Sequence, residues 1–337
     1  MDFDLTEDQL ALREGASDVL SDLASPARVR AHTTTDEPYD PALWRALVEQ
    51  GWLGVELDEA RGGLGLGTVE VAVLAEALGR HAAPAPFVPM VLALDALASA
   101  GDDAWVARLL AGDSIACVAW DATAPVPYAP SADIAIVLTD DGVYAMELTD
   151  RPRREPAMDL TRELGWLKFD PAQARRLGGA DARTRLLDRG ATFTSADLLG
   201  SASRVLELAV EYAKDRVQFG RPIGSFQAVK HRCADMLVDV EGMRSTVYWA
   251  AWCIGAADPD ASVSASTAKI WCGDASKRVM ASGLQVHGGI GFTWEHDLHF
   301  FLKRAQLDQL AFGDASAHRE RLAALLRPRV EAGESVV

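Results

Sequence analysis

The stretch Arg216-Val-Gln-Phe-Gly-Arg-Pro-Ile-Gly-Ser-Phe-Gln227 decides the fold, and a second glycine-rich stretch, Gln285-Val-His-Gly-Gly-Ile-Gly-Phe292, accompanies it. Pro222 and Gly224 cannot continue a helix, whereas apolar residues at helical spacing lie on both sides of them. The first stretch is therefore predicted to form the corner between two long helices. An arginine, an aromatic ring and amide side chains at such a corner are typical of a site that binds an anion joined to a ring system.

Long amphipathic segments surround this corner. Apolar residues recur at helical spacing in four segments, at about residues 199–217, 229–247, 262–286 and 298–326. The last of these segments is predicted to be broken at Gly313. Four such segments joined by short turns predict a C-terminal four-helix bundle over residues 193–330, followed by a tail over residues 331–337.

The first third of the chain carries start signals for helices. Thr6 followed by Gln9 is a capping-box pattern, and Asp40 before Pro41 is typical of an N-cap and a first helical turn. A later helix is predicted to start at about Val91, after a run of prolines. These signals predict an all-helical N-terminal domain over residues 1–112.

From residue 113 onward the pattern changes to short apolar runs. The runs Ile134–Thr139 and Val143–Leu148 flank Asp140-Asp-Gly142, which is a hairpin signal. Residues 113–192 are therefore predicted to form a small antiparallel β-domain. The whole chain is predicted to be mainly α.

Composition excludes several classes of protein. Acidic residues outnumber basic ones by 49 to 33, and the net charge of -16 argues against binding to a nucleic-acid backbone. The four cysteines form no CxxC pair, and no metal-ligand spacing is present, so no metal site is expected. The N-terminal residues resemble no secretion signal, and no apolar run is long enough for a membrane span, which predicts a cytoplasmic protein without membrane insertion.

The order of a helical domain, a β-domain and a four-helix bundle resembles the acyl-CoA dehydrogenase family. The two opening stretches resemble the signatures of its bundle, the first followed by Ala234-Asp-Met236 and the second by Glu295 and Arg304. The N-terminal part is similar to the same family in three further segments: Leu43-Trp-x-x-Leu-x-x-x-Gly-Trp-Leu-Gly54, Gly62-Gly-Leu-Gly65 and Glu76-x-Leu-Gly-Arg80. The resemblance covers most of the chain.

The resemblance implies FAD as cofactor and an acyl-CoA thioester as substrate. In such enzymes a carboxylate removes the α proton and the flavin accepts the β hydride, and the reduced flavin then passes its electrons to an electron-transfer acceptor. By position, Arg216 is expected at the pyrophosphate, and Phe219 and Gln227 at the adenosine end. Gln285, Gly288 and Gly289 are expected to bring main chain close to a cofactor seated mainly in a neighbouring subunit.

The chain departs from the family pattern at two places. The family's Thr-Glu-Pro and Gly-Ser-Asp segment, which holds the flavin ring, has no match between Ile115 and Leu187. The position of the usual catalytic glutamate falls on Phe312, and the alternative position of the base falls near Gly190. Asp314, two residues beyond the usual place, is the candidate substitute, unless it serves only as a helix N-cap.

Three functions follow from the resemblance and these departures. In the first, the chain is one subunit of a heteromeric dehydrogenase and completes a flavin site in trans, with a bulky, steroid-like acyl-CoA as a candidate substrate. In the second, it is a self-sufficient homomeric dehydrogenase, acting on acyl-CoA or acyl-carrier protein, with Asp314 as base. In the third, it is a catalytically silent structural partner of an active dehydrogenase.

Overall fold

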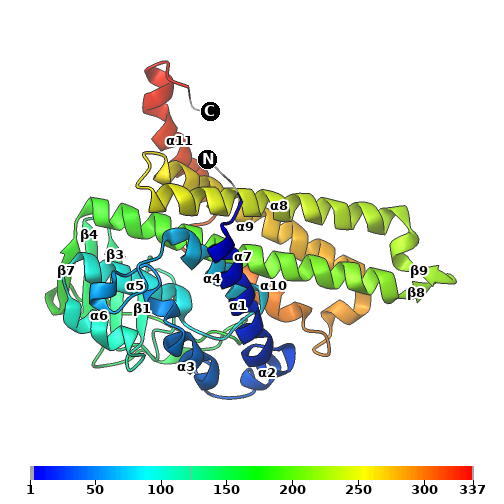
Figure 1. Ribbon diagram of the computed structural model, residues 1–337, viewed down its shortest axis with the longest axis horizontal. Coiled ribbons are helices and arrows are strands. Elements are labelled where there is room, and N and C mark those ends of the chain that lie inside the picture. Colours follow the sequence, from blue (N-terminus) through cyan, green and yellow to red (C-terminus); the bar gives the residue numbers. More distant parts are fainter. Residues whose placement is uncertain (1–3, 122, 336–337) are drawn as a thin grey trace.

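The computed structural model describes residues 4–121 and 123–335, which form eleven α-helices and three small sheets (Figure 1). The start of the predicted N-terminal domain and the last two residues of the predicted tail lie outside the described residues. The N-terminal helices are α1 (Glu7–Leu23), α2 (Pro26–His32), α3 (Pro41–Glu49), α4 (Thr68–Arg80), α5 (Phe87–Ser99) and α6 (Asp103–Leu110). The C-terminal helices are α7 (Ala180–Asp215), α8 (Gln227–Gly255), α9 (Ala261–His287), α10 (Leu298–Asp308) and α11 (Ala315–Glu331). The mainly α fold class is thus confirmed.

Two of the three predicted helix starts in the N-terminal part are confirmed. The Thr6 hydroxyl accepts a hydrogen bond from the N–H of Gln9, and the Gln9 side chain accepts one from the N–H of Thr6. The Asp40 carboxylate caps α3 by accepting hydrogen bonds from backbone N–H groups of its first turn. Helix α5 begins at Phe87, earlier than predicted, because Pro89 lies in the first turn, where a missing N–H leaves no hydrogen bond unmade.

The β-rich part is built on one four-stranded sheet in the order β1-β3-β4-β7. These strands are β1 (Ala116–Ala119), β3 (Ile134–Thr139), β4 (Gly142–Glu147) and β7 (Ala174–Gly178), and a second sheet joins β2 (Val126–Pro127), β6 (Leu164–Gly165) and β5 (Arg154–Glu155). Strands β3 and β4 form the predicted antiparallel hairpin. Strand β1 pairs with β3 in parallel, so the sheet is mixed, because the chain crosses back through β2 before β3 begins.

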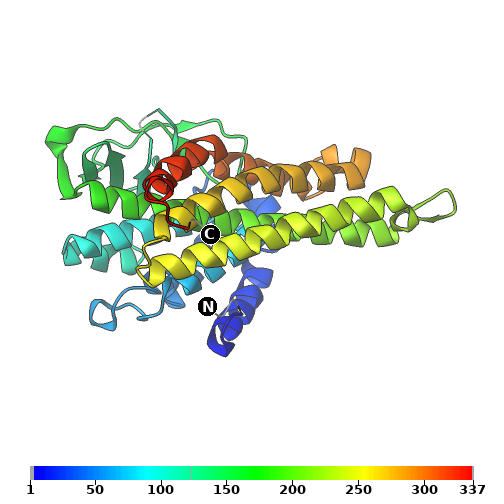
Figure 2. The same ribbon diagram turned by 90° about the horizontal axis from the view of Figure 1, so that it is seen from above.

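Helices α7, α8 and α9 lie side by side and form the body of the bundle (Figures 1 and 2). Helix α7 begins directly after the sheet, at Ala180, well before the predicted start of the bundle. Its first turns bury charged side chains: Asp188 forms an ion pair with Arg321, and Arg189 forms one with Glu56. Paired charges at buried positions interrupt the apolar spacing, which hid this part of the helix from the sequence pattern.

Gly313 interrupts the last segment as predicted, and it separates α10 from α11. Helix α10 packs against α7 and α9, while α11 packs against α9. Two places of functional interest result: the end of the bundle where α7 meets α8, and the interior where the three parts of the chain meet. Within the part of the chain that the structure describes, no helix has the length and apolar character needed to cross a membrane.

Candidate functional site

The first signature stretch forms a short hairpin at the end of the bundle. Strands β8 (Val217–Gln218) and β9 (Arg221–Pro222) pair antiparallel, and Phe219 and Gly220 make the turn. Both turn residues have positive φ, +53° for Phe219 and +76° for Gly220, which is typical of a type I′ turn. That turn favours asparagine and glycine, so an aromatic residue is strained there. Its ring is nevertheless 91% exposed.

The other predicted cofactor residues of this end are exposed as well. Arg216 follows the last turn of α7, Gln227 is the first residue of α8, and Gln285 lies near the end of α9. Among the described residues, the Arg216 guanidinium has no ion pair or hydrogen bond. An exposed, unpaired arginine at this place is free to bind a phosphate from outside the chain.

Two glycines of the second signature, Gly288 and Gly289, are not needed for the packing of this chain. A Cβ placed on Gly288 or Gly289 would meet no atom within 4 Å, whereas one on Gly291 would lie 3.1 Å from His287. Gly288 also has a φ of +61°, which favours glycine. The open space beside Gly288 and Gly289 lets another molecule approach the backbone closely.

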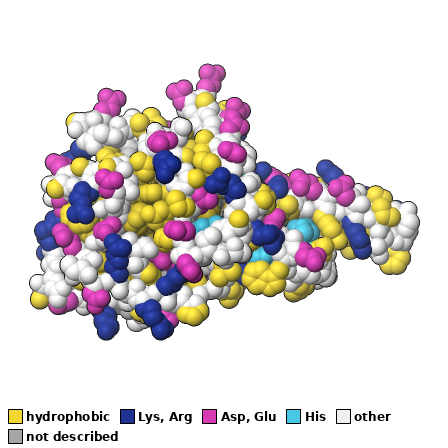
Figure 3. All heavy atoms as spheres, turned by 90° about the horizontal axis from the view of Figure 1, so that it is seen from below, with side chains coloured by type: hydrophobic (Ala, Val, Ile, Leu, Met, Phe, Trp, Pro, Cys, Tyr) yellow, Lys and Arg dark blue, Asp and Glu magenta, His cyan; other side chains and the backbone are white. Residues whose placement is uncertain are grey.

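A ring contact joins the end of α7, just before the first signature, to the second signature. His287, at the end of α9, stacks on Tyr212 of α7 with 4.8 Å between ring centroids, and its Nδ1 hydrogen-bonds the carbonyl of Gly283. Burial lowers the pKa of His287, which keeps the imidazole uncharged at neutral pH. Hydrophobic side chains gather at this narrow end of the molecule (Figure 3), and the exposed large ones in its loops are Val217, Phe219, Ile290, Phe292 and Trp294.

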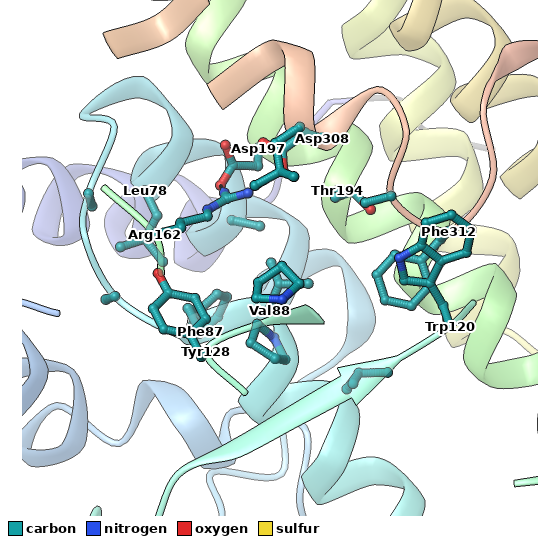
Figure 4. Close-up of a pocket in the computed structure, with 18 residues that line it drawn as sticks. Leu78, Phe87, Val88, Trp120, Tyr128, Arg162, Thr194, Asp197, Asp308 and Phe312 are labelled. Atoms are coloured by element: carbon teal, nitrogen blue, oxygen red, sulfur yellow. Dashed lines mark hydrogen bonds and ion pairs between the residues drawn. The ribbon is translucent and has the colours of Figure 1, made fainter. Parts of the chain in front are cut away.

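A cavity of about 60 Å³ lies where the helical domain, the sheets and the bundle meet (Figure 4). Leu78 of α4, Phe87 and Val88 of α5 and Trp120 after β1 contribute apolar walls. The other lining residues named in Figure 4 are Tyr128, Arg162, Thr194, Asp197, Asp308 and Phe312. The cavity is therefore apolar on one side and charged on the other.

The two positions where the resemblance places a catalytic carboxylate lie in contact. The Phe312 ring covers Gly190 of α7 so closely that a Cβ on Gly190 would lie 2.3 Å from ring carbons of Phe312. Trp120 lies beside the same ring, with centroids 6.2 Å apart. Phe312 has a φ of +58°, and its carbonyl accepts a hydrogen bond from Nε2 of His318, whose pKa burial lowers to about 4. Apolar groups thus fill both positions.

Asp314 is the N-cap of α11. Its carboxylate accepts a hydrogen bond of 2.8 Å from the N–H of Ala317. It is not among the residues that line the cavity. The structure therefore places Asp314 in the helix-capping role that the sequence left open as an alternative. No distance or contact in the structure supports its use as a base.

A buried charge network borders the cavity, and among its residues the sequence pattern pointed only to Arg304. Arg162 forms ion pairs with Asp197 of α7, at 3.0 Å, and with Asp308 of α10. Arg304, which belongs to the second signature, donates to the carbonyl of Ala83 at 2.7 Å. Burial, opposed by the charge of Arg162 and reinforced by that of Asp197, raises the pKa of Asp308 to about 6.

Comparison with known proteins agrees with this geometry. Residues 6–112 match the model of the acyl-CoA dehydrogenase N-terminal domain, and residues 178–326 match that of its C-terminal domain. "Acyl-CoA dehydrogenase IpdE2" of Mycolicibacterium smegmatis is 37% identical over 95% of this chain and 99% of its own length. The ChsE4-ChsE5 complex from Mycobacterium tuberculosis contains a chain that is 31% identical with a TM-score of 0.87, over 97% of this chain and 99% of that one.

A chain of the Tcur3481-Tcur3483 steroid ACAD is 29% identical, with a TM-score of 0.90, over 96% of this chain and 99% of that one. The similarity extends over nearly full lengths on both sides, and it includes both signatures and the helical N-terminal part. The chain belongs to the acyl-CoA dehydrogenase family, a family of oxidoreductases whose cofactor is FAD.

Proposed function

We propose that this chain is one subunit of a heteromeric, FAD-dependent acyl-CoA dehydrogenase that desaturates an acyl-CoA between its α and β carbons. The observation that carries the proposal is the contact between Phe312 and Gly190. Neither residue can remove a proton, and the Phe312 ring occupies the place where the family has its usual glutamate and closes over Gly190. In the proposed assembly the base comes from a different subunit, which a homomer of this chain does not contain.

The flavin fits one part of this chain and not the other. Trp120 and the Phe312 ring lie beside each other next to β1, and the family's ring-holding segment has no match in this part of the chain. At the end of the bundle, Arg216 is unpaired among the described residues, and the backbone at Gly288 and Gly289 is open. In the proposed assembly, FAD supplies the acceptor for the β hydride, with its ring held by the partner.

The residues at the bundle end would bind and orient the cofactor from outside. Arg216 would hold the pyrophosphate, while Phe219 and Gln227 would border the adenosine end. Gln285 and the two open glycines would bring main-chain groups within hydrogen-bonding distance. The strained, exposed ring of Phe219 supports this role, since backbone strain persists where bound groups compensate for it.

Two of the similar structures support a heteromer and suggest the substrate class. One is a complex of ChsE4 with ChsE5, and the other pairs Tcur3481 with Tcur3483 as a steroid ACAD. By analogy, the partner of this chain is a second, more complete dehydrogenase subunit. A bulky, steroid-like acyl-CoA is the proposed substrate.

Co-expression with a candidate partner of the same family tests the proposal. Flavin absorbance per subunit and acyl-CoA-dependent dye reduction, in which the dye replaces the electron acceptor, are measured for this chain alone and for the complex. Flavin and activity are expected only in the complex. A yellow, active preparation of this chain alone would refute the heteromer, and a partner that is fully active without this chain would indicate a silent structural role.

Two variants of the complex assign the roles within it. Arg216→Ala is expected to strip flavin from the complex, whereas Arg45→Ala, at an exposed arginine of α3, is the matched control and should retain it. Asp314→Asn is expected to leave turnover unchanged, because the amide oxygen of an asparagine side chain can still accept the capping hydrogen bond. A large loss of turnover with intact folding would favour Asp314 as base.

A further inference from the structure

The charged side of the interior cavity contains polar atoms without partners. Among the described residues, the hydroxyl of Tyr128, Oδ1 of Asp197 and Oδ2 of Asp308 are buried and make no hydrogen bond. All three side chains line the same cavity (Figure 4). Buried polar atoms are nearly always paired, so three unpaired ones around one cavity indicate a bound group that pairs them.

Tyr128 is held in this place against a local preference. Its φ is +61°, which is unfavourable for an aromatic residue, and its side chain is 1% exposed. Its side chain lines the cavity together with Arg162 and Asp197. The fold thus keeps a hydroxyl at a point where it serves no hydrogen bond within the described chain.

The kinds of unpaired atoms select the ligand group. The two carboxylate oxygens require a donor, and the tyrosine hydroxyl can donate or accept. An alcohol both donates and accepts, so it can pair with a carboxylate and with Tyr128 at once. A carbonyl or thioester offers no donor to Asp197 or Asp308, and an ammonium would lie close to the Arg162 guanidinium that bridges them.

The size and walls of the cavity select the remainder of the ligand. About 60 Å³ accommodates roughly four water-sized groups. Leu78, Phe87 and Val118 make the walls apolar, and the partly exposed residues Val88 and Ala311 connect the cavity with the surface. A short carbon skeleton fits inside, and a larger apolar molecule could insert one end.

We propose that this cavity is a binding site for a compact apolar alcohol, or for the hydroxyl-bearing end of a larger apolar compound, separate from the acyl-CoA thioester. The alcohol donates to Asp197 or Asp308 and accepts from Tyr128, and its carbon skeleton packs between Val88 and the Trp120–Phe312 pair. The site does not depend on the proposed heteromer, because all its residues belong to this chain.

Saturation-transfer NMR on the purified assembly tests the site with three probes of one carbon skeleton: sec-butanol, butanone and sec-butylamine. The alcohol is expected to bind with a dissociation constant on the order of millimolar, and more tightly than the other two. Tyr128→Phe should weaken binding of sec-butanol roughly tenfold, the loss of one hydrogen bond. Tyr144→Phe is the matched control, because the Tyr144 hydroxyl lies at the sheet surface and bonds Asp141.

Ala311→Leu fills the cavity from a partly exposed position and should abolish binding, which keeps the test valid if Tyr128→Phe fails to fold. Equal binding of the three probes, tighter binding of butanone or sec-butylamine, or full affinity in either cavity variant would overturn the proposal. Absence of saturable binding by sec-butanol would overturn it too, and would indicate that water alone pairs the polar atoms.

Discussion

Gly190→Ala tests whether Phe312 fills the place of a catalytic carboxylate. A Cβ on Gly190 would lie 2.3 Å from two ring carbons of Phe312, whereas carbon atoms in contact lie about 3.5 to 4 Å apart. The ring must therefore move by more than about 1 Å in a buried site, which costs about 1 to 3 kcal/mol. Replacing glycine by alanine inside a helix offsets about 0.5 to 1 kcal/mol of this cost. Urea denaturation should show a net loss of about 0 to 2.5 kcal/mol in unfolding free energy at unchanged m-value, and a double-mutant cycle with Phe312→Ala separates the clash from the helix-propensity gain.

Gly273→Ala on α9 is the matched control, because its Cβ would lie at an ordinary 3.5 Å from Ala315. This control should be neutral or more stable than the wild type. In a Phe312→Ala background the clash disappears, so Gly190→Ala should no longer destabilise, which corresponds to a coupling of about 1 to 3 kcal/mol. An equal cost of Gly190→Ala in both backgrounds would refute the contact as the reason for the loss.

Three further changes test the bundle end and the charge network. Phe219→Asn gives the hairpin the Asn-Gly sequence that its turn favours, so it should raise the unfolding free energy by about 1 kcal/mol. It should also lower the flavin content of the complex, and unchanged flavin absorbance would contradict a role for the ring. Gly289→Ala should leave the urea midpoint unchanged, since a Cβ there meets no atom within 4 Å, and lower the flavin content; a wild-type flavin content contradicts close approach to this backbone. Burial raises the pKa of Asp308 to about 6, above its value in the unfolded chain, so the folded chain binds this proton more tightly than the unfolded chain does. The unfolding free energy should therefore fall by up to about 3 kcal/mol as pH rises from about 4 to 6. Asp308→Asn should remove this contribution in denaturation curves recorded across that pH range, and an unchanged slope contradicts it.

Local signals predicted much of the fold. Thr6 and Asp40 indicate helix starts because their side chains accept hydrogen bonds from backbone N–H groups that have no partner within the helix. The residues Asp140 and Asp141 predict the β3–β4 hairpin because aspartate followed by glycine favours a tight turn between two strands. Each of these signals acts over a few residues, so the sequence displays it directly.

The interior could not be predicted in the same way. Arg162 and Asp308 are 146 positions apart in the chain, and Arg162 and Asp197 are 35 apart. Such pairs have no period in the sequence, and a buried charge on α7 looks like an interruption of its apolar stripe. The parallel pairing of β1 with β3 likewise depends on a crossover and on no local turn. Counting along the family pattern did locate Phe312 and Gly190 separately, but only the fold shows that one covers the other.

Contacts within this chain account for the unusual features around Phe312, but they do not account for those at the bundle end. Around Phe312, the unusual features have partners within the chain. The Phe312 ring packs against Gly190, where no Cβ would fit, and the Phe312 carbonyl accepts a hydrogen bond from His318. At the bundle end, the ring of Phe219 is 91% exposed although its centroid lies 6.0 Å from the ring centroid of Phe226, and a Cβ on Gly289 would meet no atom within 4 Å. Strain together with exposed apolar surface is unfavourable for a chain on its own, so their combination at that end indicates contacts with another molecule. That asymmetry is the physical reason to expect the cofactor and the partner subunit at the bundle end, and to expect the reacting carboxylate elsewhere.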